Sequence, residues 1–293
     1  MIVTLHKLLV FISGYLGAWF FAMVARVIAT GYFLFIPARV LQCSRIYRAL
    51  YSGRNFLFYL SCVWRQYHNF TRVITDRMLL LNSGDITFSS SGWEHVRDAA
   101  SRGRGAVIVM SHMGNWDVAA HLFGREGIPL LLFMGAKDRE QLEKIQKDSL
   151  ADRGIRIVAV GKDGGSPFDI IEGLGFLRNG GLVSLTGDIV WGPRQRTVEA
   201  VFFGRRIALP AAPYILAQKT GAPLLFFFAF RKGPRKYDFV IRDPLFIQPG
   251  GRSKNSEAVG AAAQKYADIL ADELAKHPFQ WYHFSDFLGG GKI

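Results

Sequence analysis

A histidine and an aspartate at positions 112 and 117 are the side chains in this sequence best placed to do chemistry. His112 follows a short apolar run at 105–110 that is bounded by glycine, a pattern typical of a buried strand. Ligands of open α/β sheets bind beyond the carboxyl ends of the strands, so His112 falls where a reactive residue is expected. A helix is predicted from Asn115, its N-cap, and Asp117 lies in its first turn, from where a carboxylate can turn back onto the imidazole.

This pairing suits general-base catalysis on an alcohol. A hydroxyl is a poor nucleophile until a base takes its proton, and histidine can accept and return a proton near neutral pH. A neighbouring carboxylate fixes the imidazole tautomer and stabilises the imidazolium. A thioester donor has a good leaving group, so acyl transfer of this kind needs no covalent enzyme intermediate. We therefore predict that His112 and Asp117 form a catalytic pair.

Other interpretations of these residues remain open. The same spacing occurs without function in many proteins. A metal site of His112, Asp117 and His121 is conceivable, because Asp117 and His121 share a helix face, but no third strong ligand lies nearby. The chain has no G-x-S-x-G nucleophile motif, and GKDGG at 161–165 lacks the spacing of a P-loop.

The elements that must position this pair alternate between strand and helix. The apolar runs and amphipathic stretches predict an α/β fold with a mostly parallel sheet and helices on both faces. The predicted strands cover 105–110, 129–134, 155–160, 182–186, 222–230 and 237–242, and the predicted helices cover 115–126, 137–154, 166–181, 209–221 and 254–277. Residues 40–80 are predicted to be helical.

The N-terminus predicts a membrane anchor. Residues 8–25 carry no charge and are about long enough to cross the hydrocarbon core, and Arg26 is predicted to end this segment. A second apolar run at 27–38 is too short to span and is expected to lie in the interface or to pack on the catalytic domain. A cleaved signal peptide is the alternative, although Lys7 is the lone preceding charge and no clean cleavage site follows. Basic residues on the C-terminal flank predict that the catalytic domain faces the cytoplasm.

The composition favours binding to a lipid surface. Half of the 293 residues are hydrophobic, the formal net charge is +13, and no acidic residue precedes Asp76. Basic residues mixed with aromatics suit an anionic lipid surface. Nucleic acid is disfavoured as a partner, because no recognised nucleic-acid-binding signature is present. Cys43 and Cys62 form no CxxC pair and are expected to be buried thiols. We divide the chain into an anchor with interfacial helices at 1–80 and a catalytic domain at 81–293.

Three sequence blocks carry a family resemblance. GRGAVIVMSHMGNWD at 103–117 resembles the signature of the lipid A biosynthesis lauroyl/myristoyl acyltransferases, in the lysophospholipid acyltransferase superfamily. The second block, at 186–224, resembles the family's region with an Asp after a strand, Gly-Pro-Arg, a Phe-Phe-Gly turn and a Thr-Gly-Ala-Pro helix end. HPFQWYHF at 277–284 resembles its Pro-x-Gln-Trp ending. The resemblance covers roughly residues 85–288.

The resemblance implies roles for individual residues. His112 would be the general base and Asp117 its orienting partner. Asn115, Asp188, Arg194 and Gly204 would serve substrate binding, and Asp188 and Arg194 would contact an acceptor phosphate, the phosphopantetheine arm or each other. The implied donor is an acyl carrier protein, ahead of acyl-CoA, and the implied acceptor is a membrane lipid such as a lipid A precursor. No metal or redox cofactor is implied.

Two departures leave the acceptor open. Val190 stands where the family often has a second acid, and the ending at 282–287 reads YHFSDF instead of continuing into His-Arg-Arg. That ending resembles the branch associated with aryl polyene lipids. Two rival functions also remain: a membrane-associated thioesterase in which His112 acts on water, and a non-catalytic lipid-binding protein of the same fold.

Overall fold

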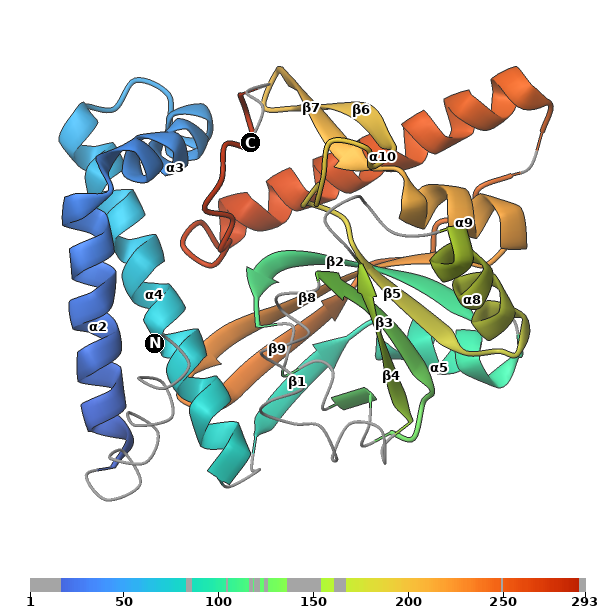
Figure 1. The fold of residues 1–293 in the computed structure, drawn as a ribbon, viewed down its shortest axis with the longest axis horizontal. Coiled ribbons are helices and arrows are strands. Elements are labelled where there is room, and N and C mark those ends of the chain that lie inside the picture. The colour runs from blue at the N-terminus through green and yellow to red at the C-terminus, as the bar shows by residue number, and fades with distance from the viewer. Residues whose placement is uncertain are drawn as a thin grey trace.

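A computed structural model describes the protein over residues 17–82, 86–103, 105–115, 118, 122–123, 126–135, 154–160, 167–248 and 250–289. Two sheets and three groups of helices make up this part of the chain (Figure 1).

The larger sheet has seven strands in the order β1-β9-β8-β2-β5-β3-β4. Neighbours from β8 to β4 run parallel, β9 is antiparallel to β8, and β1 is parallel to β9. The predicted mostly parallel sheet is therefore confirmed. Its strands are β1 Thr87–Ser91, β2 Ala106–Gly114, β3 Leu130–Gly135, β4 Ile155–Val160, β5 Leu182–Thr186, β8 Leu224–Gly233 and β9 Lys236–Ile241.

Alternation along the central strands builds a core on each face of the sheet. On β2, Val107 and Val109 belong to one cluster, whereas Ile108 and Met110 belong to the other. Successive side chains of a strand point to opposite faces, so a strand buried on both sides is apolar throughout. This is why 105–110 has no polar residue.

Helices cover both faces of this sheet. α5 (Trp93–Ser101) packs on one face, together with Val118 and Phe123. α8 (Pro167–Arg178), α9 (Ala212–Thr220) and α10 (Arg252–Lys276) lie on the other. There α10 also packs under a separate hairpin formed by β6 (Thr197–Phe202) and β7 (Arg205–Pro210).

Three N-terminal helices form a unit beside the sheet, at the left of Figure 1. α2 (Ala18–Phe35) packs against α4 (Phe56–Asn82), and α3 (Pro37–Leu50) joins them. Cys43 and Cys62 are free and buried in their shared core, as expected, and burial raises the pKa of the Cys43 thiol to about 12. The predicted boundary at residue 80 lies in the last turn of α4.

One expectation about these helices is wrong. Arg26 does not end the first apolar segment, because α2 continues through it to Phe35 as a single helix. Arg26 is exposed on α2, so its long basic side chain can reach water while the helical backbone hydrogen bonds continue past it. The run at 27–38 is therefore mostly the second half of α2, not a separate interfacial element.

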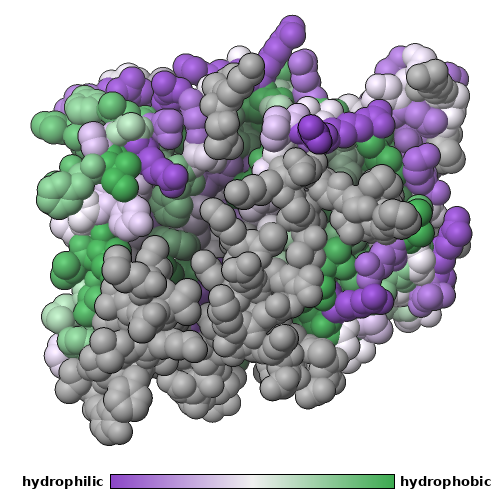
Figure 2. All heavy atoms as spheres, in the orientation of Figure 1, coloured by the Kyte–Doolittle hydropathy of each residue, from purple (hydrophilic) through white to green (hydrophobic). Residues whose placement is uncertain are grey.

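α2 is long and apolar enough, by length and composition, to cross a membrane, with a mean hydropathy of 1.6 over its 18 residues. Its outer face is apolar along the left edge of the molecule in Figure 2. One such helix near an N-terminus is consistent with membrane association. The exposed large side chains are Trp19, Met23, Val27, Ile28, Tyr32, Leu34 and Phe35.

The other predicted elements agree with the described structure, with differences at their ends. All six predicted strands are present, and helices are present at the predicted 166–181, 209–221 and 254–277. The region 40–80 is two helices, because the chain turns at Gly53, where φ is +78°. The predicted helix at 137–154 lies outside the described residues except for Gly154, and that at 115–126 is described only in part. β1, α5, β6 and β7 were not predicted.

Candidate active site

Two adjacent parallel strands end at the same place and carry the candidate residues. Met110 on β2 is in register with Thr186 on β5. His112 and Asp188 each lie two residues beyond this pair, so the topology brings them together at the carboxyl edge of the sheet, where ligands of α/β folds bind. Gly187 lets the strands approach here, since a Cβ would lie 2.5 Å from a Val109 methyl carbon.

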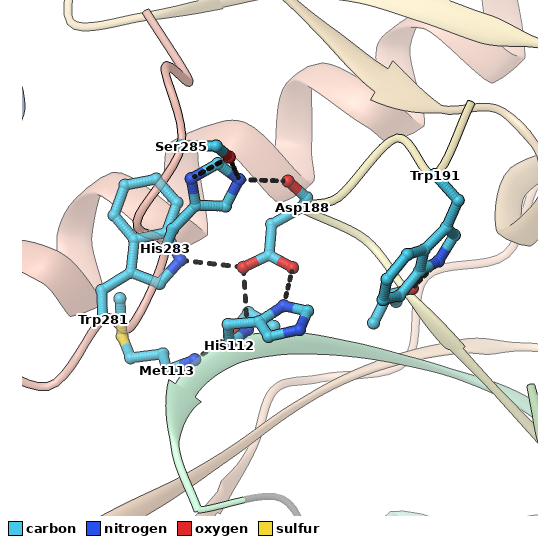
Figure 3. Close-up of polar contacts among 9 residues, drawn as sticks. His112, Met113, Asp188, Trp191, Trp281, His283 and Ser285 are labelled. Carbon is cyan, nitrogen blue, oxygen red and sulfur yellow. Dashed lines mark hydrogen bonds and ion pairs between the residues drawn. The ribbon is translucent and has the colours of Figure 1, made fainter. Parts of the chain in front are cut away.

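The Asp188 carboxylate accepts two hydrogen bonds from His112 (Figure 3). The His112 imidazole Nδ1 lies 2.9 Å from Asp188 Oδ1, and the His112 backbone N–H donates to Asp188 Oδ2 at 2.8 Å. The imidazole is 22 % exposed, whereas the carboxylate is fully buried. The site thus combines a sheltered carboxylate with a histidine that still reaches the surface.

The carboxylate stays ionised despite its burial. Burial alone would raise the pKa of Asp188, but the adjacent His112, the nearby His283 and the Trp281 indole more than offset this and hold it below its ordinary value. The Trp281 indole N–H donates to Asp188 Oδ2 at 2.8 Å. Three N–H groups therefore point at one carboxylate.

This arrangement selects the tautomer of His112. A carboxylate can only accept hydrogen bonds, so Nδ1 must carry the proton that lies between the two residues. In the neutral imidazole, the lone pair able to take a proton is then on Nε2. The geometry at Nδ1 is that of a carboxylate-oriented general base.

The C-terminal segment completes the site, and sequence reasoning assigned it no role. Met113 on β2 bridges to Trp281 in an antiparallel pair, which sets the indole over Asp188. His283 contacts the Asp188 carbonyl oxygen through Nε2 at 3.1 Å, and Ser285 Oγ lies 3.3 Å from its Nδ1. The Pro-x-Gln-Trp block was the available signal, but only the fold could show which strand it pairs with.

Gly114 is required where β2 turns away from the sheet. Its φ is +80°, and a Cβ at this position would lie 1.9 Å from the Ala229 carbonyl oxygen. Asn115, the next residue, is fully buried, and its amide Nδ2 donates to the Tyr237 hydroxyl at 3.0 Å. Asn115 thus anchors the end of the motif to β9.

The remaining predicted site residues lie in different settings. Asp117 and His121 lie outside the described residues, so the roles suggested for them stay predictions. Arg194 is exposed on the loop after Asp188, and no ion pair joins the two within the described chain. Gly204 lies at the exposed tip of the β6–β7 hairpin, where Phe203 and Gly204 have φ values of 47° and 72°.

The loop between Asp188 and Arg194 covers another side of the histidine. The Trp191 ring lies 6.4 Å from that of His112, on the side away from Trp281 (Figure 3). Its indole N–H donates to Thr186 Oγ1 at 3.2 Å, and its backbone N–H donates to Gln195 Oε1 at 2.6 Å. Trp191 thus lies near the His112 ring, whereas Trp281 contacts Asp188.

Comparison with known proteins identifies the kind of enzyme to which this site belongs. Residues 73–287 match the family described as bacterial lipid A biosynthesis acyltransferase, and that range includes every residue of the site. The chain belongs to this family. The resemblance of the sequence blocks to this family is therefore confirmed.

Two mycobacterial proteins are among the curated relatives of this chain. A phosphatidylinositol mannoside acyltransferase of Mycobacterium tuberculosis is 30 % identical over 198 residues, which cover 65 % of this chain and 57 % of the relative. A protein of the same name from Mycolicibacterium smegmatis is 26 % identical over 192 residues, covering 64 % and 58 %. The match thus spans less than two thirds of the relatives' length.

Proposed function

We propose that this acyltransferase moves a fatty acyl group from a thioester donor to a hydroxyl of a membrane lipid, with His112 as the general base. The observation that carries the proposal is the bond between His112 Nδ1 and the buried, ionised Asp188. It fixes the ring and its tautomer before substrate binds, and it would stabilise the imidazolium that forms during the reaction.

The proposed step balances as follows. Nε2 of His112 takes the proton of the acceptor hydroxyl while the hydroxyl oxygen attacks the thioester carbonyl carbon. The tetrahedral intermediate then breaks its C–S bond, and the thiolate leaves with the proton returned from Nε2. The products are an ester and a free thiol. Asp117 is proposed as a further partner of the base, as the family resemblance implies.

The charge near the site favours an acidic donor. Residues 189–210, which follow Asp188, contain only one acid, Glu199, and an exposed group of arginines. Such a surface would steer an acidic acyl carrier protein or the phosphates of CoA toward the site, and we propose the carrier protein as the donor. In this proposal Arg194 meets phosphate and Gly204 shapes the hairpin next to it. The arginines are Arg194, Arg196, Arg205 and Arg206.

The apolar face of α2 supports a lipid acceptor. We propose that α2 inserts into the inner membrane and that the basic residues following it keep the catalytic domain on the cytoplasmic side. The acceptor would be a lipid A precursor, a polyene-type lipid, or a glycolipid of the kind named for the mycobacterial relatives. Its hydroxyl would approach His112 from the membrane.

A purified assay tests the proposal. Full-length protein in detergent micelles would receive acyl carrier protein and CoA thioesters of graded chain length, with each acceptor class in turn, and mass spectrometry would detect the acylated lipid. Transfer to one acceptor class supports the proposal. Release of free fatty acid with every lipid acceptor ignored would show a thioesterase. Binding of lipid without turnover of any donor would show a non-catalytic lipid-binding protein.

A further inference from the structure

Residues 278–282 lie between the catalytic strand and the N-terminal helices. One edge of this segment pairs with the end of β2: the Gly114 N–H donates to the Gln280 carbonyl at 2.7 Å, and the Tyr282 N–H donates to the His112 carbonyl at 2.8 Å. The segment is therefore hydrogen-bonded to the main chain of the histidine proposed as the base.

Side chains of the N-terminal helices hold the other edge. Tyr47 of α3 donates its hydroxyl to the Pro278 carbonyl at 3.0 Å. Asn69 of α4 donates to the Phe279 carbonyl at 3.3 Å, and Gln66 of α4 donates to the Trp281 carbonyl at 2.5 Å. Side chains of α3 and α4 are thus hydrogen-bonded to the same short segment that pairs with the end of β2.

Gln66 makes the contact closest to the reaction. Its side chain and Trp281 are both buried, and the indole of Trp281 is the group that donates to Asp188 Oδ2. A line of three contacts therefore runs from Gln66 through Trp281 and Asp188 to the Nδ1 of His112. Buried polar bonds of this kind hold their partners in one arrangement, because no water is at hand to replace a lost partner.

We propose that Gln66 is a positioning residue of this acyltransferase: its amide holds the Trp281 main chain so that the indole stays on Asp188 and Asp188 stays on His112. The inference rests on the proposed role of His112. It also gives α4, which the sequence assigns to the membrane-attached part of the chain, a place in the catalytic machinery. Positioning of the base does not touch the substrates, so the loss should fall on kcat and leave KM for donor and acceptor nearly unchanged.

Gln66→Met tests this contact with little change of volume. Gln66 Oε1 has no hydrogen-bond partner among the described residues, so methionine also removes a buried unsatisfied oxygen and can keep the fold intact. We expect kcat to fall ~10- to 10²-fold, because small displacements of a reacting group are costly. Gln218→Met is the matched control: Gln218 donates to the Asn255 carbonyl at 3.1 Å, on α9 and away from Asp188.

A double substitution separates positioning from a general loss of structure. If Gln66 acts through Trp281, then Gln66→Met combined with Trp281→Phe should be no slower than Trp281→Phe alone. Losses that multiply in the double variant would overturn the proposal. If Gln66→Met fails to fold by gel filtration and thermal unfolding, Gln66→Leu replaces it, since leucine also lacks the donor and brings no charge into the buried site.

Chemical modification gives a readout that does not depend on acyl transfer. Diethyl pyrocarbonate reacts with neutral imidazole, and mass spectrometry can follow the modification of His112 as a function of pH. We expect the midpoint to shift in Gln66→Met and Trp281→Phe and to be unchanged in Gln218→Met. If the pH midpoint of His112 modification shifts in Gln66→Met but the wild-type protein transfers no acyl group, the proposed function is refuted and the positioning role stands. Unchanged midpoint and unchanged kcat in Gln66→Met would overturn the positioning role.

Discussion

The Asp188 carboxylate meets three N–H donors: the backbone and Nδ1 of His112, and the indole of Trp281. The carboxylate is fully buried, so these bonds hold it in one orientation and the imidazole with it. An ionised oxygen pair can satisfy all three, whereas an amide of the same shape offers one acceptor oxygen and two competing N–H groups. The charge and the acceptor count of Asp188 are therefore both needed.

Asp188→Asn should lower kcat by ~10²–10⁴-fold without abolishing folding. An amide N–H₂ facing Nδ1 would place the histidine proton on Nε2, and that nitrogen could no longer accept one. Steady-state kinetics of the purified variant measures the effect, with Asp238→Asn as control because Asp238 lies on β9 with Ser89 and Lys232 as partners. Near-normal kcat in Asp188→Asn would rule out this role.

Gly114→Ala should destabilise the protein far more than Gly204→Ala. Both glycines have positive φ, +80° and +72°, so alanine at either pays a backbone penalty of ~1–2 kcal/mol. Only at Gly114 does the new Cβ collide with a carbonyl oxygen, that of Ala229, whereas nothing lies within 4 Å at Gly204. Urea unfolding in detergent micelles compares the two, and equal losses would show that the close approach at Gly114 is not a constraint.

At the scale of the elements, the ends of β2 and β5 and the C-terminal segment bring His112, Asp188 and Trp281 together. The strands could be predicted from the sequence, because short and mostly apolar runs such as 105–110 and 182–186 are typical of buried strands. The pairing of Asp188 with His112 was not, since it depends on β2 and β5 being neighbours in the sheet. Trp281 could not be predicted as a site residue either, because its place beside Asp188 depends on an antiparallel bridge between Trp281 and Met113.

The histidine of the C-terminal segment should make stability depend on pH. Burial lowers the pKa of His283, and its two neighbours fit the neutral ring: Nε2–H donates to the Asp188 carbonyl, and Nδ1 accepts from Ser285. The unfolded chain then binds a proton near the ordinary pKa of about 6.5, while the folded chain does not. The free energy of unfolding should therefore fall as pH drops below about 6.5, until the lowered folded pKa is reached.

His283→Gln should flatten part of this dependence. Glutamine can donate to the same carbonyl and does not titrate, whereas His68 and His277, whose pKa values are also lowered by burial, keep their share. Urea unfolding at pH 5, 6 and 7 gives the slopes. A slope in His283→Gln equal to that of the wild type would show that folding does not lower the pKa of His283.

At the scale of the whole molecule, the apolar helix α2 is joined to the site of His112 and Asp188 through α4. α2 packs along α4, and α4 in turn holds the C-terminal segment and ion-pairs with β8 through Asp76 and Arg231, whose Oδ2 and Nε lie 2.7 Å apart. The apolar helix α2 is thus connected to the site through its packing on α4, and α4 reaches the site through the polar contacts of Gln66 and Asn69. The sequence indicated the apolar helix but not this connection, because the partners lie more than 150 positions apart in the chain.

Charges on the outer face of α2 should release the protein from lipid. Val27, Leu34 and Phe35 are each more than half exposed, and each would lose ~1.5 kcal/mol or more of burial in the membrane. Replacing all three by glutamate should reduce vesicle binding by at least ~10²-fold in a flotation assay at high salt. Ile171→Glu, at an exposed apolar residue of α8, should change nothing. Retention of the triple variant on vesicles would place the lipid contact elsewhere.

The most direct test of the catalytic account is acyl transfer by His112→Ala. Equal amounts of purified wild-type and variant protein would receive an isotope-labelled acyl thioester and the lipid acceptor found in the assay above, and mass spectrometry would count labelled ester per enzyme over time. We expect a rate lower by ~10²–10⁴-fold in the variant, with unchanged thermal unfolding and unchanged vesicle binding. A variant that folds, binds vesicles and transfers the acyl group at the wild-type rate would contradict the role of His112 as the base.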